Sequence, residues 1–453
     1  MKLMWSIKMK FFKNLNRMGK VGLIIFIILN ASFIFLLVSP YIPNLIGEYR
    51  DSILLEQCEE DILKYRTGKI KIKLEFSNGT PATNYNISFD HILHDFIFGS
   101  NIFAFNSYNE SIHPNYNELY KMYFKKLYNL AVLPFYWGGY EPSEGNFPTI
   151  SKLNEIVNWC KWNNITTKGH PIHWTRSAGK PDWIPIENDT KMFNLMENRT
   201  KMLVSQYREK IQYWDVVNEP THTETYAGLS KVNYCLYPLQ WANIANPDSL
   251  LTINDYGIIG HDFGGGPYYQ LLNSLISKGA PIDFIGLQSH EPRTDWIPAT
   301  EIWATYNAYS KLGKPIHITE FEPVSAEVPI TNSWKKGIWS EAAQAEFARR
   351  FYILSFAHPS VEGVIWWDLC DLGSWLENGG LIRSDMTPKP VYYELDNLIN
   401  HQWRTKGSEL SNSTGWIDFQ GYFGVYNISI QDGAYNFQIK AKSNSNNQFL
   451  FVI

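Results

Sequence analysis

Two glutamates, each at the end of a short and largely apolar run, are the residues of this sequence best suited to chemistry. The run 213–217 ends in Asn218 and Glu219, and a second run, 316–319, ends in Glu320. Such runs are typical of buried β-strands, and a (β/α)₈ barrel holds its catalytic groups at the carboxyl ends of its strands. Two carboxyl groups are the minimum needed to cleave a glycosidic bond, one as acid and one as nucleophile or base. We therefore interpret Glu219 and Glu320 as a catalytic pair.

An alternation of strands and helices surrounds the two glutamates. Eight apolar runs are separated by stretches of helical periodicity between about residues 97 and 403, which favours an α/β fold. Eight strands with helices between them, over about 300 residues, match a (β/α)₈ TIM barrel. The predicted strands are 96–101, 131–137, 166–173, 213–218, 250–254, 284–289, 316–320 and 361–367, and predicted helices include 117–129, 151–163, 268–278 and 341–357.

Eight short motifs in this region carry a family resemblance. In order they are Glu141-Pro142-x-x-Gly145-x-Phe147, Gly169-His170-x-x-x-Trp174, Trp214-Asp215-Val216-Val217-Asn218-Glu219-Pro220, Asn254-Asp255-Tyr256, Gly286-Leu287-Gln288-Ser289-His290, Ile318-Thr319-Glu320, Trp367 with Ser374-Trp375, and Pro388-Lys389-Pro390. In that order and at those predicted strand ends, they make the region similar to glycoside hydrolase family 10, the endo-β-1,4-xylanase family. The resemblance implies a barrel that hydrolyses a β-linked polysaccharide such as xylan.

The resemblance also implies a role for each matching residue. Glu219 is expected to be the general acid/base and Glu320 the nucleophile, with carboxyl groups about 5–5.5 Å apart, as retention of configuration requires. Asn218 is expected to hold the sugar 2-hydroxyl. His290 would hydrogen-bond the nucleophile, and Glu322, where the family more often has Asp, would orient His290. The residues expected to bind substrate are His170, Gln288, Trp174, Trp137, Tyr136, Tyr256, Trp367 and Trp375. No metal or organic cofactor is implied, because the two carboxylates suffice.

The sequence departs from the family pattern beside the cleavage site. Where family members carry Glu-Asn-x-x-Lys-Trp, this chain has Val132 and Leu133 in place of Glu and Asn, and Tyr136 in place of Lys. After Trp174, where another histidine is usual, the residue is Thr175. The residues replaced in the first motif normally grip the sugar one place beyond the cleavage subsite. We therefore expect weak activity on plain xylan and better activity on a decorated or different β-glycan.

The N-terminal region predicts a membrane anchor. An uncharged run at 21–38 would span roughly 28 Å as a helix, close to the hydrocarbon thickness of a bilayer. Six cations precede it and place that side in the cytoplasm: Lys2, Lys8, Lys10, Lys13, Arg17 and Lys20. The alternative is a cleaved signal peptide, which would give a secreted protein. Either interpretation places the predicted barrel outside the cytoplasm.

Strands are also predicted on both sides of the barrel. Residues 69–76 alternate strictly between lysine or glutamate and apolar side chains, and residues 426–439 alternate in the same way around a turn. Neither segment has enough strands for a stable sheet by itself, so we expect the two to form one small β-sandwich. The predicted organisation is a basic tail (1–20), an anchor (21–39), a stalk or helix (40–65), sandwich strands (66–96), the barrel (97–403) and further sandwich strands (404–453).

The net charge and the cysteine spacing bear on the partners and bound metals that the protein could have. A net charge of −4 gives no argument for a nucleic-acid partner. The cysteines Cys58, Cys160, Cys235 and Cys370 are too widely spaced for a zinc cluster. Disulfides and free buried thiols both remain open for them.

Two alternatives to a xylanase-like function are the same chemistry on a different β-glycan and a surface carbohydrate-binding protein without turnover. A binding protein has no need of both Glu219 and Glu320, so the sequence favours an enzyme.

Overall fold

The structure, a computed structural model, describes residues 42–453, so the predicted tail and anchor lie outside the described residues. Within 42–453, no helix is both long enough and apolar enough to cross a membrane. The described part begins with α3 (Ile42–Arg66), a helix predicted over 47–65. Cys58 and Ile62, four residues apart and therefore on one face of this helix, are buried in the main hydrophobic core.

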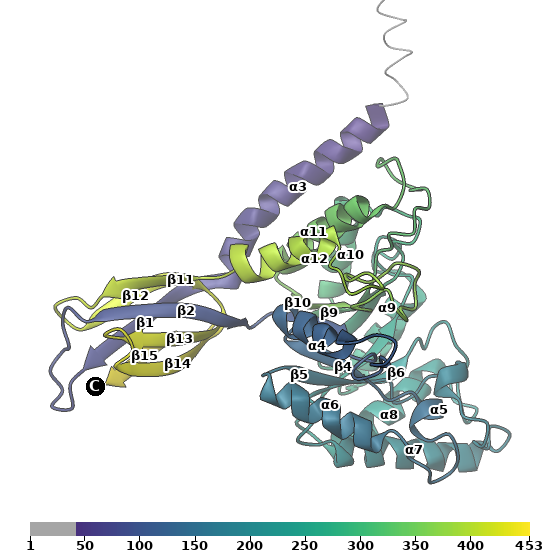
Figure 1. Ribbon diagram of the computed structural model, residues 1–453. Helices are drawn as coiled ribbons and strands as arrows, with labels where there is room; N and C mark the ends of the chain where they lie inside the picture. The colour runs from purple at the N-terminus through teal and green to yellow at the C-terminus, as the bar shows by residue number, and fades with distance from the viewer. Residues whose placement is uncertain (1–41) are drawn as a thin grey trace, which may run out of the picture. The chain divides into compact units, whose positions relative to one another are not determined.

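Eight parallel strands close into a barrel, as the sequence predicts (Figure 1). Each strand pairs with the next along the chain, and β10 closes the ring by pairing with β3. The strands are β3 (Ile97–Asn101), β4 (Leu130–Pro134), β5 (Thr166–His170), β6 (Tyr213–Asn218), β7 (Leu250–Asp255), β8 (Ile285–Ser289), β9 (Ile316–Phe321) and β10 (Val361–Trp366).

Amphipathic helices separate the strands and bury their apolar faces in the core. In α4, for example, Tyr120, Phe124 and Leu127 recur at the helical period and are all buried. In α11, Ser340 caps the first turn by accepting a hydrogen bond from the N–H of Ala343. The helices are α4 (Tyr116–Leu127), α5 (Trp137–Tyr140), α6 (Ile150–Trp162), α7 (Asp189–Gln206), α8 (Lys231–Ala245), α9 (Pro267–Ser277), α10 (Ala299–Ser310), α11 (Glu341–Ala357) and α12 (Pro390–Asn397), with a 3₁₀ turn at Ser177–Gly179 and a π turn at Leu398–Gln402.

Two strands end earlier than predicted, and proline is the reason in both. The strand predicted over 131–137 ends at Pro134, which has no N–H for the ladder. The carbonyl of Tyr136 then accepts from the N–H groups of Gly139 and Tyr140, which forms the short helix α5. The strand predicted over 166–173 ends at His170, immediately before another proline.

The strands outside the barrel form two facing sheets. One sheet has the order β12-β1-β15 and the other β11-β2-β13-β14, so strands from before and after the barrel pair with one another. Ile70, Ile72 and Leu74 of β1 point into the core between the sheets, and the lysines between them point outward. Phe89 and Phe419 stack across that core with ring centres 3.8 Å apart. The strands are β1 (Thr67–Glu75), β2 (Asn86–His94), β11 (Lys406–Leu410), β12 (Trp416–Tyr422), β13 (Gly424–Ile430), β14 (Tyr435–Ala441) and β15 (Gln448–Val452).

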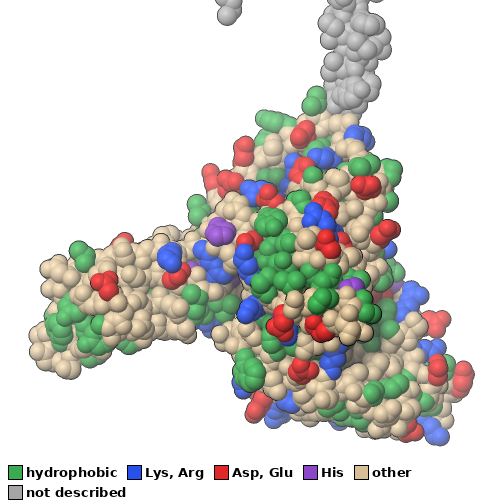
Figure 2. All heavy atoms as spheres, viewed as in Figure 1, with side chains coloured by type: hydrophobic (Ala, Val, Ile, Leu, Met, Phe, Trp, Pro, Cys, Tyr) green, Lys and Arg blue, Asp and Glu red, His purple; other side chains and the backbone are tan. Residues whose placement is uncertain are grey.

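One open question from the sequence, the state of the cysteines, is answered by the structure. All four cysteines are free and buried, so the free-thiol alternative holds and no disulfide forms. On the face shown in Figure 2, acidic and basic side chains are interspersed. This mixture agrees with the small net charge of the sequence.

Candidate active site

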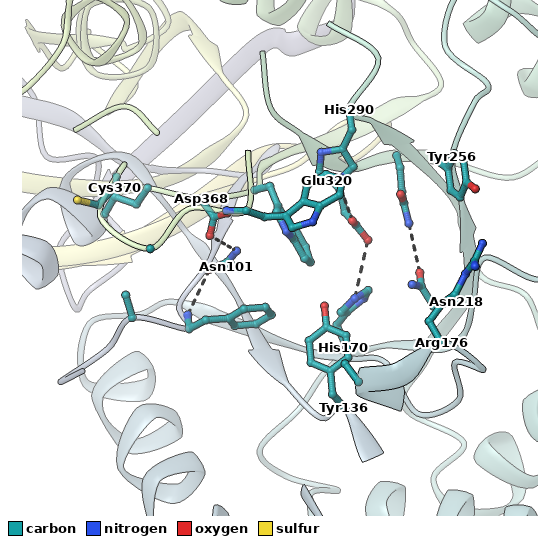
Figure 3. Close-up of a pocket in the computed structure, with 18 of the residues that line it drawn as sticks. Asn101, Tyr136, His170, Arg176, Asn218, Tyr256, His290, Glu320, Asp368 and Cys370 are labelled. Carbon is teal, nitrogen blue, oxygen red and sulfur yellow. Dashed lines mark hydrogen bonds and ion pairs between the residues drawn. The ribbon is translucent and has the colours of Figure 1, made fainter. Parts of the chain in front are cut away.

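A cleft of about 1270 Å³ opens at the carboxyl ends of the barrel strands (Figure 3). Most of the predicted site residues meet there, although they come from different strands and the loops that follow them. Those that line the cleft are Tyr136, His170, Trp174, Asn218, Glu219, Tyr256, Gln288, His290, Glu320, Trp367 and Trp375. Trp137 and Glu322 are the two predicted residues that do not line it.

Glu219 is held in the cleft by an unusual backbone. Its φ is 53°, in the left-handed region that residues other than glycine seldom adopt. Its N–H donates to the carbonyl of Asn254 on the next strand at 2.6 Å, which fixes this conformation. The carboxyl group accepts hydrogen bonds from Nε1 of Trp174 at 2.9 Å and from Nε2 of Gln288 at 3.4 Å. Local strain of this kind is found at functional sites, where surrounding contacts maintain it.

Glu320 reaches the cleft through a bulge in β9. The pairing of β9 with β8 shifts register after Leu287, and Thr319 has no partner on β8. An extra residue of this kind re-aims the side chains beside it. Thr319 and Glu320 consequently both hydrogen-bond the side chain of Asn254, at 2.5 and 2.6 Å, although consecutive residues of a regular strand face opposite sides.

A chain of side-chain amides links the two carboxyl groups. Gln288 Nε2 lies 3.4 Å from Glu219 Oε1 and 3.3 Å from Asn218 Oδ1. Asn254 Nδ2 donates to the same Asn218 oxygen at 3.1 Å and to Glu320 Oε1 at 2.6 Å. Because its oxygen is already engaged, Asn218 can offer a ligand its NH₂ group. These hydrogen bonds between amide side chains hold the two carboxyl groups in fixed positions relative to one another.

The two glutamates are electrostatically coupled. Burial raises the pKa of Glu320 to about 8; the nearby His170 opposes this rise and Glu219 adds to it. Because Glu219 contributes to the raised pKa of Glu320, a charge on one carboxyl group disfavours a charge on the other. A pair of carboxyl groups with one proton is the state that double-displacement hydrolysis requires.

Three buried side chains, Lys168, Asp215 and His170, form a row of polar contacts that ends next to Glu320. Lys168 Nζ is 2.9 Å from Asp215 Oδ1, and Asp215 Oδ2 is 2.8 Å from His170 Nδ1. Burial alone would raise the pKa of Asp215, but Lys168 and His170 outweigh that effect and hold it below its usual value. The ionised Asp215 therefore accepts the Nδ1 proton of His170, whose Nε2 lies 3.8 Å from Glu320 Oε1.

His290 lies within hydrogen-bond distance of Glu320, as expected, but Glu322 lies too far from His290 for a hydrogen bond. His290 Nε2 lies 2.9 Å from Glu320 Oε2. Burial lowers the pKa of His290 to about 3, so the ring is neutral and donates this hydrogen bond. Glu322 Oε2 lies 3.6 Å from His290 Nδ1, which is too far for a hydrogen bond, and Nδ1 has no hydrogen-bond partner. Glu322 therefore lies beside His290 without a hydrogen bond to it, and the orienting role stays a prediction.

The expectation that Trp137 binds substrate is corrected. Because β4 ends at Pro134, the turn of α5 carries Trp137 into the core, where it is 1% exposed. Its Nε1 donates to Glu141 Oε2 at 3.1 Å, and the Arg199 guanidinium lies 4.7 Å from its ring centre. Trp137 supports the cleft from behind and presents no surface to a ligand.

Tyr136 does face the cleft, inside a cage of rings. Its ring centre lies 6.0 Å from that of Phe103, 5.4 Å from His170 and 5.7 Å from Trp174. Burial raises the pKa of its hydroxyl well above the usual value, so the group is neutral. Val132 and Leu133, which replace the polar residues of the family motif, are buried in the core and do not line the cleft. This end of the cleft therefore offers ring faces and few polar groups.

Two tryptophans form one wall of the cleft. Trp367 and Trp375 belong to the segment after β10, residues 367–380, here called the wall loop. Trp375 is 58% exposed, and its ring lies 4.7 Å from that of His290. The guanidinium of Arg293 packs on the same Trp375 ring at 4.6 Å. An exposed tryptophan face at this position suits packing against a pyranose ring.

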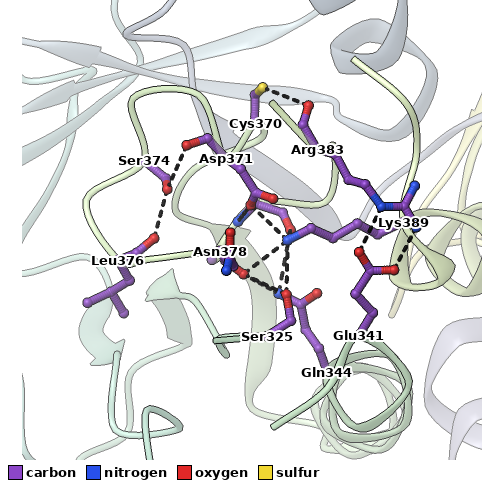
Figure 4. A network of polar contacts seen from close by, with 12 residues as sticks. Ser325, Glu341, Gln344, Cys370, Asp371, Ser374, Leu376, Asn378, Arg383 and Lys389 are labelled. Carbon is purple, nitrogen blue, oxygen red and sulfur yellow. Dashed lines mark hydrogen bonds and ion pairs between the residues drawn. The ribbon is translucent and has the colours of Figure 1, made fainter. Parts of the chain in front are cut away.

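A buried lysine fixes the wall loop from below (Figure 4). Lys389 is 1% exposed, and its Nζ contacts Asp371 Oδ1 at 2.7 Å. The same ammonium group donates to the carbonyls of Asn378 and Gly380 at 3.0 and 2.9 Å. Lys389 also donates to Ser325 Oγ at 3.1 Å, so its buried ammonium group ties the wall loop to the segment after β9, and this predicted motif residue is structural.

The opposite wall is built around Tyr256. Its ring stacks on His222 at 3.9 Å, and His222 Nδ1 hydrogen-bonds Asp255 at 2.7 Å, which raises the pKa of the histidine. Glu291 lies beside this stack and accepts the N–H of Gly257 at 2.6 Å. Burial raises the pKa of Glu291 to about 7. This wall can offer a ring face and a carboxyl group to a sugar.

Several cleft residues are not identified by the sequence argument. Asn101 and Asp368 line the cleft at the ends of the first and last barrel strands, and their positions directly after apolar runs could have indicated them. Arg176, Glu291 and Arg293 lie in loops and belong to none of the motifs. No sequence signal distinguishes these three from ordinary surface residues.

Comparison with known proteins agrees with this geometry. Residues 94–398, which contain all eight barrel strands and both glutamates, match the family model of glycosyl hydrolase family 10. The chain belongs to this family. Solved family 10 structures share the barrel: xylanase 10B of Thermotoga petrophila, solved in complex with xylobiose, aligns with a TM-score of 0.56 at 22% identity over 68% of this chain and 95% of that one.

Curated relatives include proteins of two kinds. The anti-sigma-I factor RsgI6 of Acetivibrio thermocellus is 24% identical over 86% of this chain and 49% of its own length. Endo-1,4-beta-xylanase 2 of Arabidopsis thaliana is 29% identical over 69% of this chain and 28% of its own length. The chain thus spans less than half the length of these relatives.

Proposed function

We propose that this protein is a retaining endo-β-1,4-glycosidase of the xylanase type. The observation that carries the proposal is the set of side-chain amides that holds Glu219 and Glu320 in one cleft. Trp367 and Trp375 line the same cleft. Several family 10 relatives are named endo-1,4-beta-xylanases, which supports a β-linked polysaccharide as the substrate class.

The hydrogen bonds at the two carboxyl groups favour distinct roles. Glu320 accepts from Asn254 at 2.6 Å and from His290 at 2.9 Å, whereas Glu219 accepts at 2.9 and 3.4 Å. Shorter hydrogen bonds from two donors stabilise an ionised carboxylate more strongly. These hydrogen bonds favour Glu320 as the nucleophile and Glu219 as the general acid/base, the roles that the family resemblance implies.

The reaction then follows a double displacement. Glu219 protonates the leaving oxygen while the Glu320 carboxylate attacks the anomeric carbon, which breaks the glycosidic bond and forms a glycosyl ester on Glu320. Glu219, now ionised, takes a proton from water as the water attacks the anomeric carbon and releases Glu320. The NH₂ group of Asn218 is placed to hold the sugar 2-hydroxyl.

The location of the enzyme is part of the proposal. The uncharged run 21–38 with its preceding cations supports an N-terminal membrane anchor and a catalytic barrel outside the cytoplasm. A secreted form is the alternative if that run is cleaved. In either case the cleft would meet polysaccharide outside the cell.

A hydrolysis panel tests the activity. The purified chain is incubated with xylan, other β-glucans and aryl β-glycosides, and released reducing ends and product lengths are measured, with Glu320→Ala as the matched control. We expect internal cleavage of a β-1,4-linked glycan by the natural chain alone. Product lengths also separate endo from exo cleavage.

A second candidate is a surface glycan-binding protein without turnover. The observation that favours a role without turnover is the match over 86% of this chain to a protein named as an anti-sigma-I factor, a name that denotes no hydrolase. Glycan binding is supported by the exposed ring of Trp375 in the cleft. Binding of a panel glycan, measured by calorimetry with no reducing ends released over a long incubation, would favour this candidate over the enzyme.

A further inference from the structure

A second pair of carboxyl groups lies behind the cleft. Glu322, two residues beyond the proposed nucleophile, is 0% exposed, and its carboxyl group contacts that of Asp368 in the wall loop. Gly379 covers it from the other side so closely that a Cβ there would lie 2.5 Å from Glu322 Oε1. Glu322 is therefore sealed from water between β9 and the wall loop.

The two carboxyl groups differ in the donors that they meet. Asp368 Oδ1 accepts from Asn101 Nδ2 at 2.9 Å, and Oδ2 accepts from the N–H of Trp375 at 2.8 Å. Neither oxygen of Glu322 meets a donor. Two ionised carboxylates would repel each other, and their contact becomes a hydrogen bond only if one carries a proton. The donors place the negative charge on Asp368, so the proton belongs on Glu322.

We propose that Glu322 is a neutral carboxylic acid at neutral pH and donates its O–H to Asp368, clasping the wall loop to the strand that carries Glu320. The clasp acts beside Trp375, because the Asp368 carboxylate also binds the Trp375 backbone. Glu322 and Asp368 are thus positioning residues for the tryptophan wall.

The neighbouring charges agree with this assignment. Burial, then the charge of Asp368 and its hydrogen bond, raise the pKa of Glu322 well above the usual value; Glu320 adds to the rise, and Arg293 opposes it. His290 also faces Glu322 but is itself neutral.

Protonation of Glu322 also protects the nucleophile. An ionised Glu322 would lie 3.6 Å from His290 Nδ1 and would draw a proton onto that ring. The resulting imidazolium would neutralise Glu320 across their 2.9 Å contact and weaken its attack. With Glu322 neutral, His290 donates one hydrogen bond and leaves the Glu320 charge intact.

Glu322→Gln tests the proposal, because an amide NH₂ keeps the donor and the volume while it removes the carboxyl group. The first measurement is infrared spectroscopy of the full-length chain at neutral pH, which does not depend on the proposed function. Glu320 and Glu291, whose pKa values are raised to about 8 and about 7, also contribute to the carbonyl stretch of protonated carboxyl groups, so the spectrum of Glu322→Gln is subtracted from that of the natural chain. We expect this difference to show the loss of one protonated carboxyl group. The matched control is Glu341→Gln, since the Glu341 carboxyl group accepts two hydrogen bonds from Arg383, and it should leave the carbonyl stretch unchanged.

The second measurement uses activity and rests on the proposed function. We expect kcat of Glu322→Gln to exceed that of Glu322→Ala by about tenfold or more, the usual effect of one hydrogen bond to a charged group. A difference spectrum without the loss of a protonated carboxyl group, or a Gln variant no better than Ala, would overturn the proposal. If no variant and not even the natural chain releases product, the proposed function fails while the infrared result still decides the protonation of Glu322.

Discussion

At the scale of single residues, the proposed mechanism gives the two glutamates of the cleft different roles. Glu320→Ala should abolish nearly all hydrolysis, and Glu219→Ala should lower kcat/KM on polysaccharide by about 10²–10⁴-fold, the usual worth of general acid–base catalysis. Added azide should restore turnover of Glu219→Ala on an activated aryl glycoside, because it replaces the water that needs a base. Near-normal turnover by Glu320→Ala would contradict the assignment.

The raised pKa of Glu320 predicts that catalysis costs stability. A carboxyl group whose folded pKa is about 8, against 4.5 ordinarily, binds its proton more tightly in the folded state, so stability is lost as pH rises from about 4.5 to 8. Glu320→Gln should therefore raise the free energy of unfolding at pH 8 by about 1–3 kcal/mol and have little effect at pH 4. Thermal unfolding at both pH values measures the difference. An equal effect at both would exclude the buried charge as its cause.

Tyr136 predicts a limit on substrate choice. Tyr136→Lys restores the family residue, but we expect it not to restore vigorous hydrolysis of plain xylan, because Val132 and Leu133 are in the core and cannot assist a lysine. The loss of charged hydrogen bonds at that subsite is worth about 2–4 kcal/mol. Rates on plain and decorated xylan, compared for both proteins, provide the measurement. Rapid hydrolysis of unsubstituted xylan by the natural chain would show the inference to be wrong.

The motifs correctly identified residues that lie directly at strand ends. They were less successful for residues whose contacts depend on the length and direction of the side chain. Glu219 and Glu320 follow apolar runs, so their place at the cleft could be predicted from period and position. The role of Glu322 could not, because one extra methylene and the approach of Gly379 decide which neighbour its carboxyl group meets. The inward turn of Trp137 depends on where β4 ends.

At the scale of elements, the sandwich depends on strands that lie on both sides of the barrel. β1 lies between β12 and β15, and β2 lies between β11 and β13. Truncation after residue 403 should leave β1 and β2 without partners, expose Ile70 and Ile72, and cause aggregation or a lower Tm. Light scattering and calorimetry of the truncated and natural chains check this. Unchanged stability would show residues 404–453 to be an independent module.

The order and type of barrel elements were predictable, because each strand run and each helical period is local in sequence. The residues at which the strands end were harder to predict. The runs that continue past Pro134 and His170 remain apolar or aromatic, and only the missing proline N–H and the capture of the Tyr136 carbonyl by α5 end the strands there. The bulge at Thr319, which turns Glu320 inward, depends on the neighbouring strand and has no sequence signal.

At the scale of the whole molecule, the proposed anchor has a direct test. Removal of residues 1–40 should yield a soluble and active protein, whereas the full chain should stay with membranes through a carbonate wash. Fractionation with detection of the intact N-terminus provides the measurement. The full chain in the soluble fraction with residue 1 still present would exclude the anchor.

The interleaved sandwich also has a consequence for biogenesis. Gln420 donates a hydrogen bond to Thr67 across 353 residues of sequence. At about 5–20 residues per second, β1 and β2 leave the ribosome tens of seconds before their partners exist, and must stay unpaired while the barrel strands between them are made. A chain that stops anywhere inside the barrel can never cover them. Unpaired β1 and β2 strands therefore distinguish an incomplete chain from a finished one.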